Sequence, residues 1–270
     1  MTDAAMKTRT VNGVELALVD RGSGQVVVLV HGFPLDHAMW DAQVEALSAR
    51  CRVIAPDLRG FGQSGVTEGT VTMTQFADDL AALLDTLNVA EPVVLCGLSM
   101  GGYIAFQFWL GHASRLRGLI LCDTRAVADT PEIAAGRLET AERVLKEGPA
   151  SLVETMKPKL LAEATIRAQP QMINALEQVM ARCDPRGIAA AARGMAQRPD
   201  MTSHLGHMNV PTLVIVGEDD IISPPQEMWA IASAIPGARF VEIAGSGHMS
   251  PVEKPAEFNA TVLEFLAGLR

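Results

Sequence analysis

A serine lies in a glycine-rich frame between a buried strand-like run and a helical pattern. Gly97, Ser99 and Gly101 form a GxSxG pattern after the apolar run 93–96, and helical spacing begins near Met100. Small residues on both sides permit the strained turn that exposes such a hydroxyl, and free amides at the helix start stabilise developing negative charge. The pattern predicts a nucleophilic serine at position 99, although the glycines taken alone are equally typical of a tight turn.

A serine hydroxyl is a poor nucleophile near neutral pH and needs an adjacent base, which is itself oriented by an acid. His248 ends the run GSGH at 245–248, a loop of small residues between the last predicted strand and a helix. An imidazole there can reach across the edge of the sheet, so we predict that His248 is the base. We place His37 and His112 at solvated helix positions, and His31 at a strand end, where it bonds loop backbone.

Several carboxylates compete for the role of the acid. Glu218, Asp219 and Asp220 are adjacent and follow the apolar run 212–216, and Asp123 ends an earlier run. Each of them lies after the serine and before His248, the chain order Ser, acid, His that one known type of triad uses. The residues alone leave the choice open.

Apolar runs and helical patterns alternate along most of the chain and would position these groups. Residues 26–30 are aliphatic on both faces, which is typical of a buried parallel strand. Helical spacing of apolar residues occurs at 76–87 and 262–269, and Asn12-Gly13 indicates a hairpin turn. Further strand-like runs occur at 52–55, 93–96, 119–122 and 212–216, and a weaker one at 239–243. The alternation predicts a doubly wound, mostly parallel α/β sheet.

The segment 125–200 breaks this alternation. Its apolar residues recur only at helical spacing, its acidic and basic residues nearly balance, and it contains no Phe, Tyr or Trp. We therefore predict a core formed by residues 1–124 and 201–270 and a helical insertion at 125–200, whose inner face is aliphatic and rich in methionine.

Composition limits the class of protein and of partner. The chain has 270 residues, 49% hydrophobic and 20% charged, which excludes a disordered chain. A net charge of −9 disfavours nucleic acid and anionic membranes as partners. No apolar run approaches the roughly 18 residues that cross a bilayer, and no signal sequence is evident, so a cytoplasmic protein is expected. Nothing in the sequence indicates an oligomeric state.

Neither a disulfide nor a metal site is indicated by the cysteine and histidine spacing. The cysteines show no CxxC pattern, and most lie in strand-like runs, so we expect buried free thiols. His204 and His207 have a helix-like metal spacing but no carboxylate or cysteine frame around them, so no metal is predicted.

Segments along nearly the whole core together resemble the α/β-hydrolase superfamily. They are HGFP at 31–34, PDLRGFGQS at 56–64, GLSMGG at 97–102, GEDDIISP at 217–224 and GSGH at 245–248. The resemblance implies a helical cap inserted after the sixth core strand. It also implies that Asp220, in a G-x-x-D-x-x-x-P frame with Gly217 and Pro224, is the acid; Asp123 matches the position that some relatives use instead.

Acyl transfer also needs two backbone donors for the oxyanion. The amide of Met100, one residue after the serine, is one of them, and the resemblance to an HGxP loop implies Phe33 as the second. We expect Asp57, Arg59 and the glycines near them to form a structural turn.

The expected activity is that of a serine hydrolase that cleaves small carboxylic esters, a carboxylesterase that needs no cofactor. The segment LCDTRA at 121–126 resembles small esterases and the enol-lactone hydrolases of aromatic catabolism, so an enol-lactonase is the alternative. A perhydrolase and a non-catalytic ligand-binding protein of the same fold stay open.

Residues of the segment 125–200 are candidates for contact with a small ester or lactone. Arg125 could bind the free carboxylate of such a lactone, although an arginine at this place is more often solvated or paired with an acid. Apolar residues of the insertion would line the pocket, or would only pack its helices together: Met156, Leu160, Leu161, Ile173 and Met180.

Overall fold

Within residues 6–269, which the computed structural model describes, the strands form one eight-stranded sheet in the order β1-β2-β4-β3-β5-β6-β7-β8. The strands are β1 (Lys7–Val11), β2 (Val14–Gly22), β3 (Val26–Val30), β4 (Arg52–Pro56), β5 (Val93–Leu98), β6 (Leu116–Cys122), β7 (Thr212–Gly217) and β8 (Arg239–Ile243). β1 and β2 form a hairpin at Asn12 and Gly13, and β2 pairs antiparallel with β4. All further pairs are parallel, which confirms the predicted α/β sheet.

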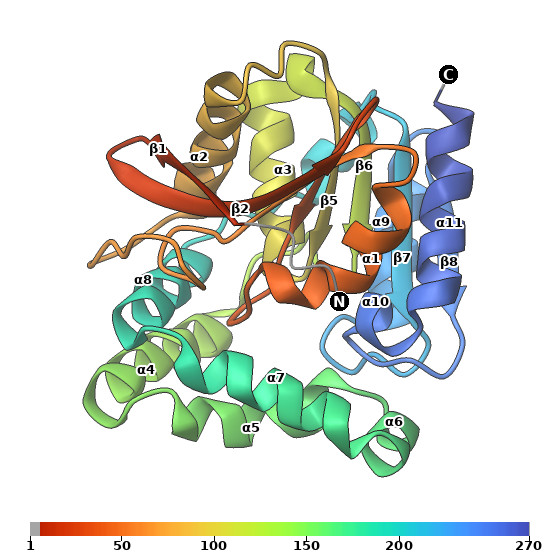
Figure 1. The fold of residues 1–270 in the computed structure, drawn as a ribbon. Coiled ribbons are helices and arrows are strands. Elements are labelled where there is room, and N and C mark those ends of the chain that lie inside the picture. The colour runs from red at the N-terminus through yellow and green to blue at the C-terminus, as the bar shows by residue number, and fades with distance from the viewer. Residues whose placement is uncertain (1–5, 270) are drawn as a thin grey trace.

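Helices cover both faces of the sheet because the parallel strands carry apolar side chains on both sides. One core cluster joins the sheet to α2 (Met73–Thr86), α3 (Met100–His112) and α9 (Pro225–Ala234). The other cluster joins it to α1 (Asp41–Leu47) and α11 (Pro255–Gly268), which flank the sheet in Figure 1. The short elements are η1 (His37–Trp40), η2 (Ala113–Arg115), η3 (Thr202–His207) and α10 (Ser250–Glu253).

The chain between β6 and β7 forms a helical layer beside the sheet (Figure 1). Its helices are α4 (Pro131–Glu147), α5 (Ala150–Leu160), α6 (Glu163–Ala168), α7 (Pro170–Arg182) and α8 (Pro185–Ala196). Arg182 forms an ion pair with Asp36, and the Cys183 thiol donates to the Pro34 carbonyl. Because Pro34 and Asp36 follow β3, the layer lies over the carboxyl edge of the sheet. The exact boundaries of a 125–200 unit stay a prediction.

Helix α8 contacts the core backbone directly. A Cβ atom added at Gly187 would lie 1.9 Å from the carbonyl oxygen of Gly60, so no larger residue fits without a shift of the main chain. The Val71 N–H donates to the Ala190 carbonyl at 3.1 Å. These contacts fix α8 against the loop that follows β4.

A contact between His37 and Asp57 stabilises the turn after β4, and the predicted exposure of His37 is wrong. His37, predicted at a solvated helix position, is half-buried, and its Nδ1 lies 2.7 Å from Oδ1 of the buried Asp57. Oδ2 of Asp57 accepts from the Gln63 amide, so Asp57 serves the structural turn that was predicted here. His31 bonds loop backbone as expected, because its Nε2 accepts from the Leu58 amide.

Two further findings concern the cysteines and the possibility of a membrane-spanning helix. Cys51, Cys96, Cys122 and Cys183 are buried and free, as predicted. No helix among the described residues is long and apolar enough to span a bilayer.

Candidate active site

Ser99 occupies a sharp turn between β5 and α3. Its φ of 55° and ψ of −111° are unusual for a residue with a side chain. A Cβ atom on Gly97 would lie 2.2 Å from the Gly101 carbonyl oxygen, and one on Gly101 would lie 2.3 Å from the Val30 carbonyl oxygen. The GxSxG glycines are therefore required by close backbone approach, and the turn has the form that the pattern predicts for an exposed nucleophile.

Neighbouring strand ends fix the backbone of Ser99. Its N–H donates to the Cys122 carbonyl at 2.9 Å, and its carbonyl accepts from the Thr124 hydroxyl at 2.7 Å. The Ser99 side chain is partly exposed, and its hydroxyl makes no hydrogen bond within residues 6–269. The backbone is constrained while the hydroxyl remains available for a reacting group.

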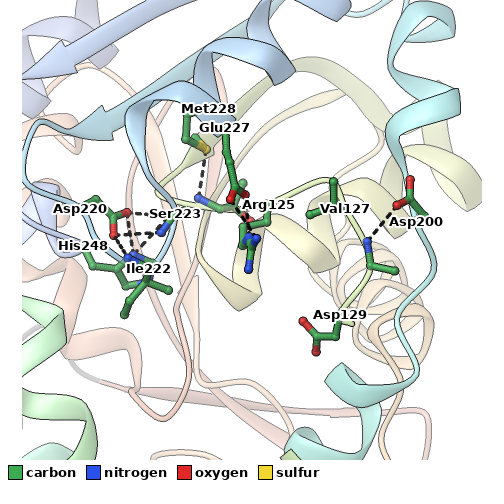
Figure 2. A network of polar contacts seen from close by, with 12 residues as sticks. Arg125, Val127, Asp129, Asp200, Asp220, Ile222, Ser223, Glu227, Met228 and His248 are labelled. Atoms are coloured by element: carbon green, nitrogen blue, oxygen red, sulfur yellow. Dashed lines mark hydrogen bonds and ion pairs between the residues drawn. The ribbon is translucent and has the colours of Figure 1, made fainter. Parts of the chain in front are cut away.

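Asp220 and His248 form a buried pair. His248 Nδ1 lies 2.8 Å from Asp220 Oδ2, and the two side chains are 3% and 0% exposed. Oδ1 of Asp220 accepts from the amides of Ile222 and Ser223 at 2.8 and 3.1 Å. Figure 2 shows Asp220, Ser223 and His248 pointing toward one another. Because a carboxylate holds Nδ1–H, Nε2 keeps its lone pair and can act as a base.

The electrostatic environment favours the charged form of Asp220. Burial alone would raise the pKa of this carboxyl, but the His248 ring and the hydrogen bonds from Ser223 outweigh burial and lower the pKa. The group thus keeps its charge at neutral pH, as an acid that orients an imidazole requires.

Asp123, the alternative acid, has different partners. Its Oδ1 accepts from the Gly217 amide at 2.8 Å, and its Oδ2 lies 2.6 Å from the Ser250 hydroxyl. Burial, followed by the nearby charge of Asp220, raises the pKa of Asp123 well above its ordinary value. The structure brings Asp220 to His248, whereas Asp123 contacts Gly217 and Ser250 instead.

All these groups lie at one edge of the sheet. Ser99 directly follows β5, Asp220 follows β7, and His248 follows β8. The carboxyl ends of neighbouring parallel strands meet at the same edge, where α/β sheets bind ligands. Ser250, two residues after His248, bonds Asp123, which directly follows the carbonyl that accepts from Ser99 N–H. The histidine loop and the serine turn are therefore joined through the end of β6.

The predicted oxyanion donors are both available. Met100 N–H starts α3, and Phe33 N–H lies in the turn after β3, which the Leu35 amide closes onto the Gly32 carbonyl. Neither amide donates a hydrogen bond within the described part of the chain. A Cβ atom on Gly32 would lie 3.5 Å from the Ser99 Cβ, so this turn borders the serine.

Arg125 is engaged by a carboxylate of the protein. Its Nε and Nη2 lie 2.7 and 2.9 Å from the two Glu227 oxygens, a bidentate pair that Figure 2 shows. Burial alone would lower the pKa of Arg125, but Glu227 outweighs this effect and raises it. Contact between Arg125 and a substrate carboxylate stays a prediction, and it would require this ion pair to open.

The predicted pocket residues of the insertion differ in their surroundings. Leu160 and Leu161 are buried, and both line a cavity of about 10 Å³ between α5 and α7, too small for an ester. Leu161 also borders an open groove of about 910 Å³ that reaches the Asp220 loop. Met156 is half-buried and packs against both core clusters. Their role in substrate binding remains a prediction.

Sequence reasoning missed two polar residues of this site. Ser223 contacts Asp220 and His248 from the Asp220 loop, and the buried Glu253 accepts from the Gly247 and Ala162 amides at 2.8 and 2.9 Å. A serine three residues after an aspartate was the only available signal for the first, and Glu253 carried none.

One group of described side chains lies close enough together to share a metal ion, namely Asp36, His37 and Asp57. Hydrogen bonds already use these atoms: Asp57 accepts from His37 and Gln63, and Asp36 accepts from Arg182 and the Ala38 amide. The arrangement is that of a satisfied structural turn.

Comparisons with known proteins agree with this geometry. A family model described as the alpha/beta hydrolase fold matches residues 25–255. A 3-oxoadipate enol-lactonase of Acinetobacter baylyi is 31% identical over 86% of this chain and 85% of its own length. A thermophilic esterase from Thermogutta terrifontis, solved with malate, is 48% identical with a TM-score of 0.96, over 98% of this chain and 99% of that chain. An enol-lactonase from Burkholderia xenovorans is 32% identical with a TM-score of 0.90, over 97% and 100%.

Proposed function

The chain belongs to the α/β-hydrolase family, and from this premise we propose that it is a carboxylesterase that cleaves small carboxylic esters through an acyl-enzyme on Ser99. The observation that carries the proposal is the buried hydrogen bond between Asp220 and His248, at the same sheet edge as the strained turn of Ser99. A nucleophile, a base and a charged orienting acid are the parts that acyl transfer by a serine needs.

The reaction has two halves. In the first, Ser99 Oγ attacks the ester carbonyl while His248 Nε2 takes its proton, and the same proton then passes to the leaving alcohol. In the second, His248 takes a proton from water, which attacks the acyl-enzyme and releases the acid and Ser99. Asp220 keeps the proton on Nδ1 and stabilises the imidazolium during both halves.

The amides of Met100 and Phe33 would bind the oxyanion of each tetrahedral intermediate. Each such donor is worth about 3 kcal/mol of transition-state stabilisation. The first turn of α3 adds its dipole at the same point, because Ser99 is the N-cap residue of that helix.

Hydrolysis of an enol-lactone is the second candidate, and similarity to enol-lactonases from two organisms favours it. The same triad would open a lactone, with the leaving oxygen retained in the product. Neutral esters are favoured by the state of Arg125, the residue proposed to bind a lactone carboxylate. Its guanidinium already forms a bidentate ion pair with Glu227. A panel of p-nitrophenyl esters from C2 to C12, beside neutral and anionic lactones, ranks the two candidates by kcat/KM.

The test of the proposed function is Ser99→Ala with p-nitrophenyl acetate as substrate. We expect loss of at least about three orders of magnitude in kcat, because the nucleophile is absent. An organophosphate should add one covalent group to the wild-type protein and none to the variant by mass spectrometry. Ser203→Ala, which alters an exposed serine, is the control and keeps wild-type activity.

Other outcomes identify the remaining alternatives. Ester hydrolysis that survives in Ser99→Ala, or that a chelator abolishes, would contradict the acyl-enzyme mechanism. Peracid formation from acetate and hydrogen peroxide would identify a perhydrolase. Binding of a lactone or an ester without turnover would identify a non-catalytic receptor.

A further inference from the structure

Ser223 is a buried serine in contact with both members of the proposed acid–base pair. Its side chain is fully buried, and its Oγ lies 2.5 Å from Asp220 Oδ2 and 3.3 Å from His248 Nδ1. Its backbone N–H donates to the other Asp220 oxygen at 3.1 Å. A single residue therefore contacts both oxygens of the carboxylate and approaches the imidazole.

Chemistry fixes the direction of these contacts. A charged carboxylate only accepts hydrogen bonds, so the Ser223 hydroxyl donates its proton to Asp220 Oδ2. This oxygen is the one that also accepts from His248 Nδ1, and the two donors share its acceptor strength. The Ser223 oxygen, at 3.3 Å, faces Nδ1 as a second and weaker acceptor.

We propose that Ser223 is a positioning residue for the hydrolysis proposed above. Its hydroxyl holds the Asp220 carboxylate in one orientation and shares Oδ2 with His248 Nδ1–H, so it sets the strength of the hydrogen bond that orients the imidazole. This inference rests on the proposed function for its catalytic consequence but not for the hydrogen bonds that define it.

Other acidic residues lie near the pair. Asp123 approaches Asp220 from the end of β6, and Glu253 approaches Asp123 from α10. Glu218 and Asp219, from the same loop as Asp220, are exposed to solvent. The Ser223 hydrogen bonds lower the pKa of Asp220, after the opposing effect of burial and the larger effect of His248. Substitution of Ser223 by another uncharged residue leaves all of these acidic side chains in place.

The test is Ser223→Ala, measured as kcat/KM against pH on the best ester of the panel. With one competing donor removed, Oδ2 binds the imidazolium more strongly, and the midpoint of the acid limb moves to higher pH by about half a unit. In the absence of substrate, the proton NMR resonance of His248 Nδ1–H moves downfield, because its hydrogen bond to Oδ2 strengthens.

Matched variants separate this role from general destabilisation. Ser246→Ala removes another buried serine hydroxyl near His248, one that donates to the Ile243 carbonyl, and it should leave both the acid limb and the NMR resonance at their wild-type positions. Ser223→Thr retains a hydroxyl and should restore the wild-type values of both. Ser223→Cys, a weaker donor, should shift both in the same direction as alanine but less.

The pH profile and the NMR resonance of the Ser223 variants decide whether Ser223 is a positioning residue. Wild-type values of both readouts in folded Ser223→Ala overturn the proposal, and if the alanine variant fails to fold, wild-type values in Ser223→Cys overturn it equally. Absence of ester hydrolysis by the wild-type protein would overturn the proposed function, whereas the NMR comparison would still test the role of Ser223.

Discussion

Ser99 combines a strained backbone with an unengaged side chain. A non-glycine residue at positive φ costs about 1–3 kcal/mol, and here hydrogen bonds to Cys122 and Thr124 hold the residue in place. The two carboxyl groups nearby differ from each other, because the pKa of Asp220 is lowered and the pKa of Asp123 is raised. The pKa values of two acids within one site are thus shifted in opposite directions, and of the two only Asp220 contacts the histidine.

Substitution of the two acids by asparagine should separate their roles. Asp220→Asn leaves an amide that can donate to Nδ1 and favours the wrong tautomer of His248, so kcat should fall by roughly 10⁴ with p-nitrophenyl acetate. Asp123→Asn should retain kcat within about one order of magnitude, because Asp123 bonds Gly217 and Ser250 rather than the imidazole. A larger loss in Asp123→Asn than in Asp220→Asn would reverse the assignment.

The sequence indicates the site residues unequally. Ser99 and His248 lie in frames of small residues whose spacing reports backbone geometry, so both are predicted from local pattern. Asp220 and Asp123 each follow a strand, and only the folded loops decide which of them meets His248. Ser223 escaped prediction because a serine three residues after an aspartate does not by itself specify a side-chain contact with Asp220 and His248.

At the scale of elements, a buried carboxylate joins the insertion to the histidine loop. Glu253, on α10, accepts from Gly247 N–H with one oxygen and from Ala162 N–H, between α5 and α6, with the other. Gly247 directly precedes His248. The position of the insertion and the position of the proposed base are therefore linked through one side chain.

Glu253→Gln tests this link with little change of volume. An amide can accept only one of the two N–H groups and turns its own NH₂ toward the other, so the free energy of unfolding should fall by about 1–3 kcal/mol. We also expect kcat to fall several-fold as the histidine loop shifts. Urea unfolding and kcat on a short-chain ester measure the two effects.

The control for this prediction is Glu257→Gln, which changes an exposed residue on α11 and should alter neither quantity. Wild-type stability in Glu253→Gln would show that the two amide contacts contribute nothing.

Elements differed in how readily the sequence predicted them. β5 and β7 are buried along their whole length, so uniform apolar runs identified them. β8 forms the edge of the sheet and is exposed or half-buried over most of its length, which explains its weaker pattern. Short helices such as α1 and α10 contain too few turns to show periodicity, and they escaped prediction.

At the scale of the whole molecule, the response of stability to pH depends on buried pairs. Burial would raise the pKa of Asp57, but His37 lowers it; burial would lower the pKa of His37, but Asp57 raises it. Stability from a raised histidine is present below its unfolded pKa, about 6.5, and is lost as pH rises through the folded value. Stability from the lowered carboxyl is present above about pH 3.9 and is lost on further acidification.

His37→Gln should therefore destabilise the protein more at pH 5.5 than at pH 9. The charge attraction to Asp57 contributes at the lower pH, whereas only a neutral hydrogen bond remains at the higher pH. Urea unfolding at the two pH values measures the difference. His112→Gln, which removes a more exposed partner of Asp78, is the control and should have a small effect at both values. A larger effect of His37→Gln at pH 9 would contradict the assignment.

The overall architecture followed from the sequence more completely than the detail did. Alternation of apolar runs with helical spacing predicted the α/β sheet, and loss of that alternation after residue 124 predicted helices there, as observed. The contacts of those helices with the core were not predictable, because Arg182 and Glu253 find partners more than 90 residues away in sequence.

The close backbone contact between Gly60 and Gly187 limits where the chain can be recombined with a related protein. Main chain meets main chain there, so the fit depends on backbone shape alone and tolerates no foreign side chain. A chimaera that exchanges helices of the insertion should therefore retain the native α8, together with the Ala162 amide that Glu253 binds. Recombination inside α8 would disrupt the contact between Gly60 and Gly187 and also the close approach of Gly194, in the same helix, to the Val71 carbonyl.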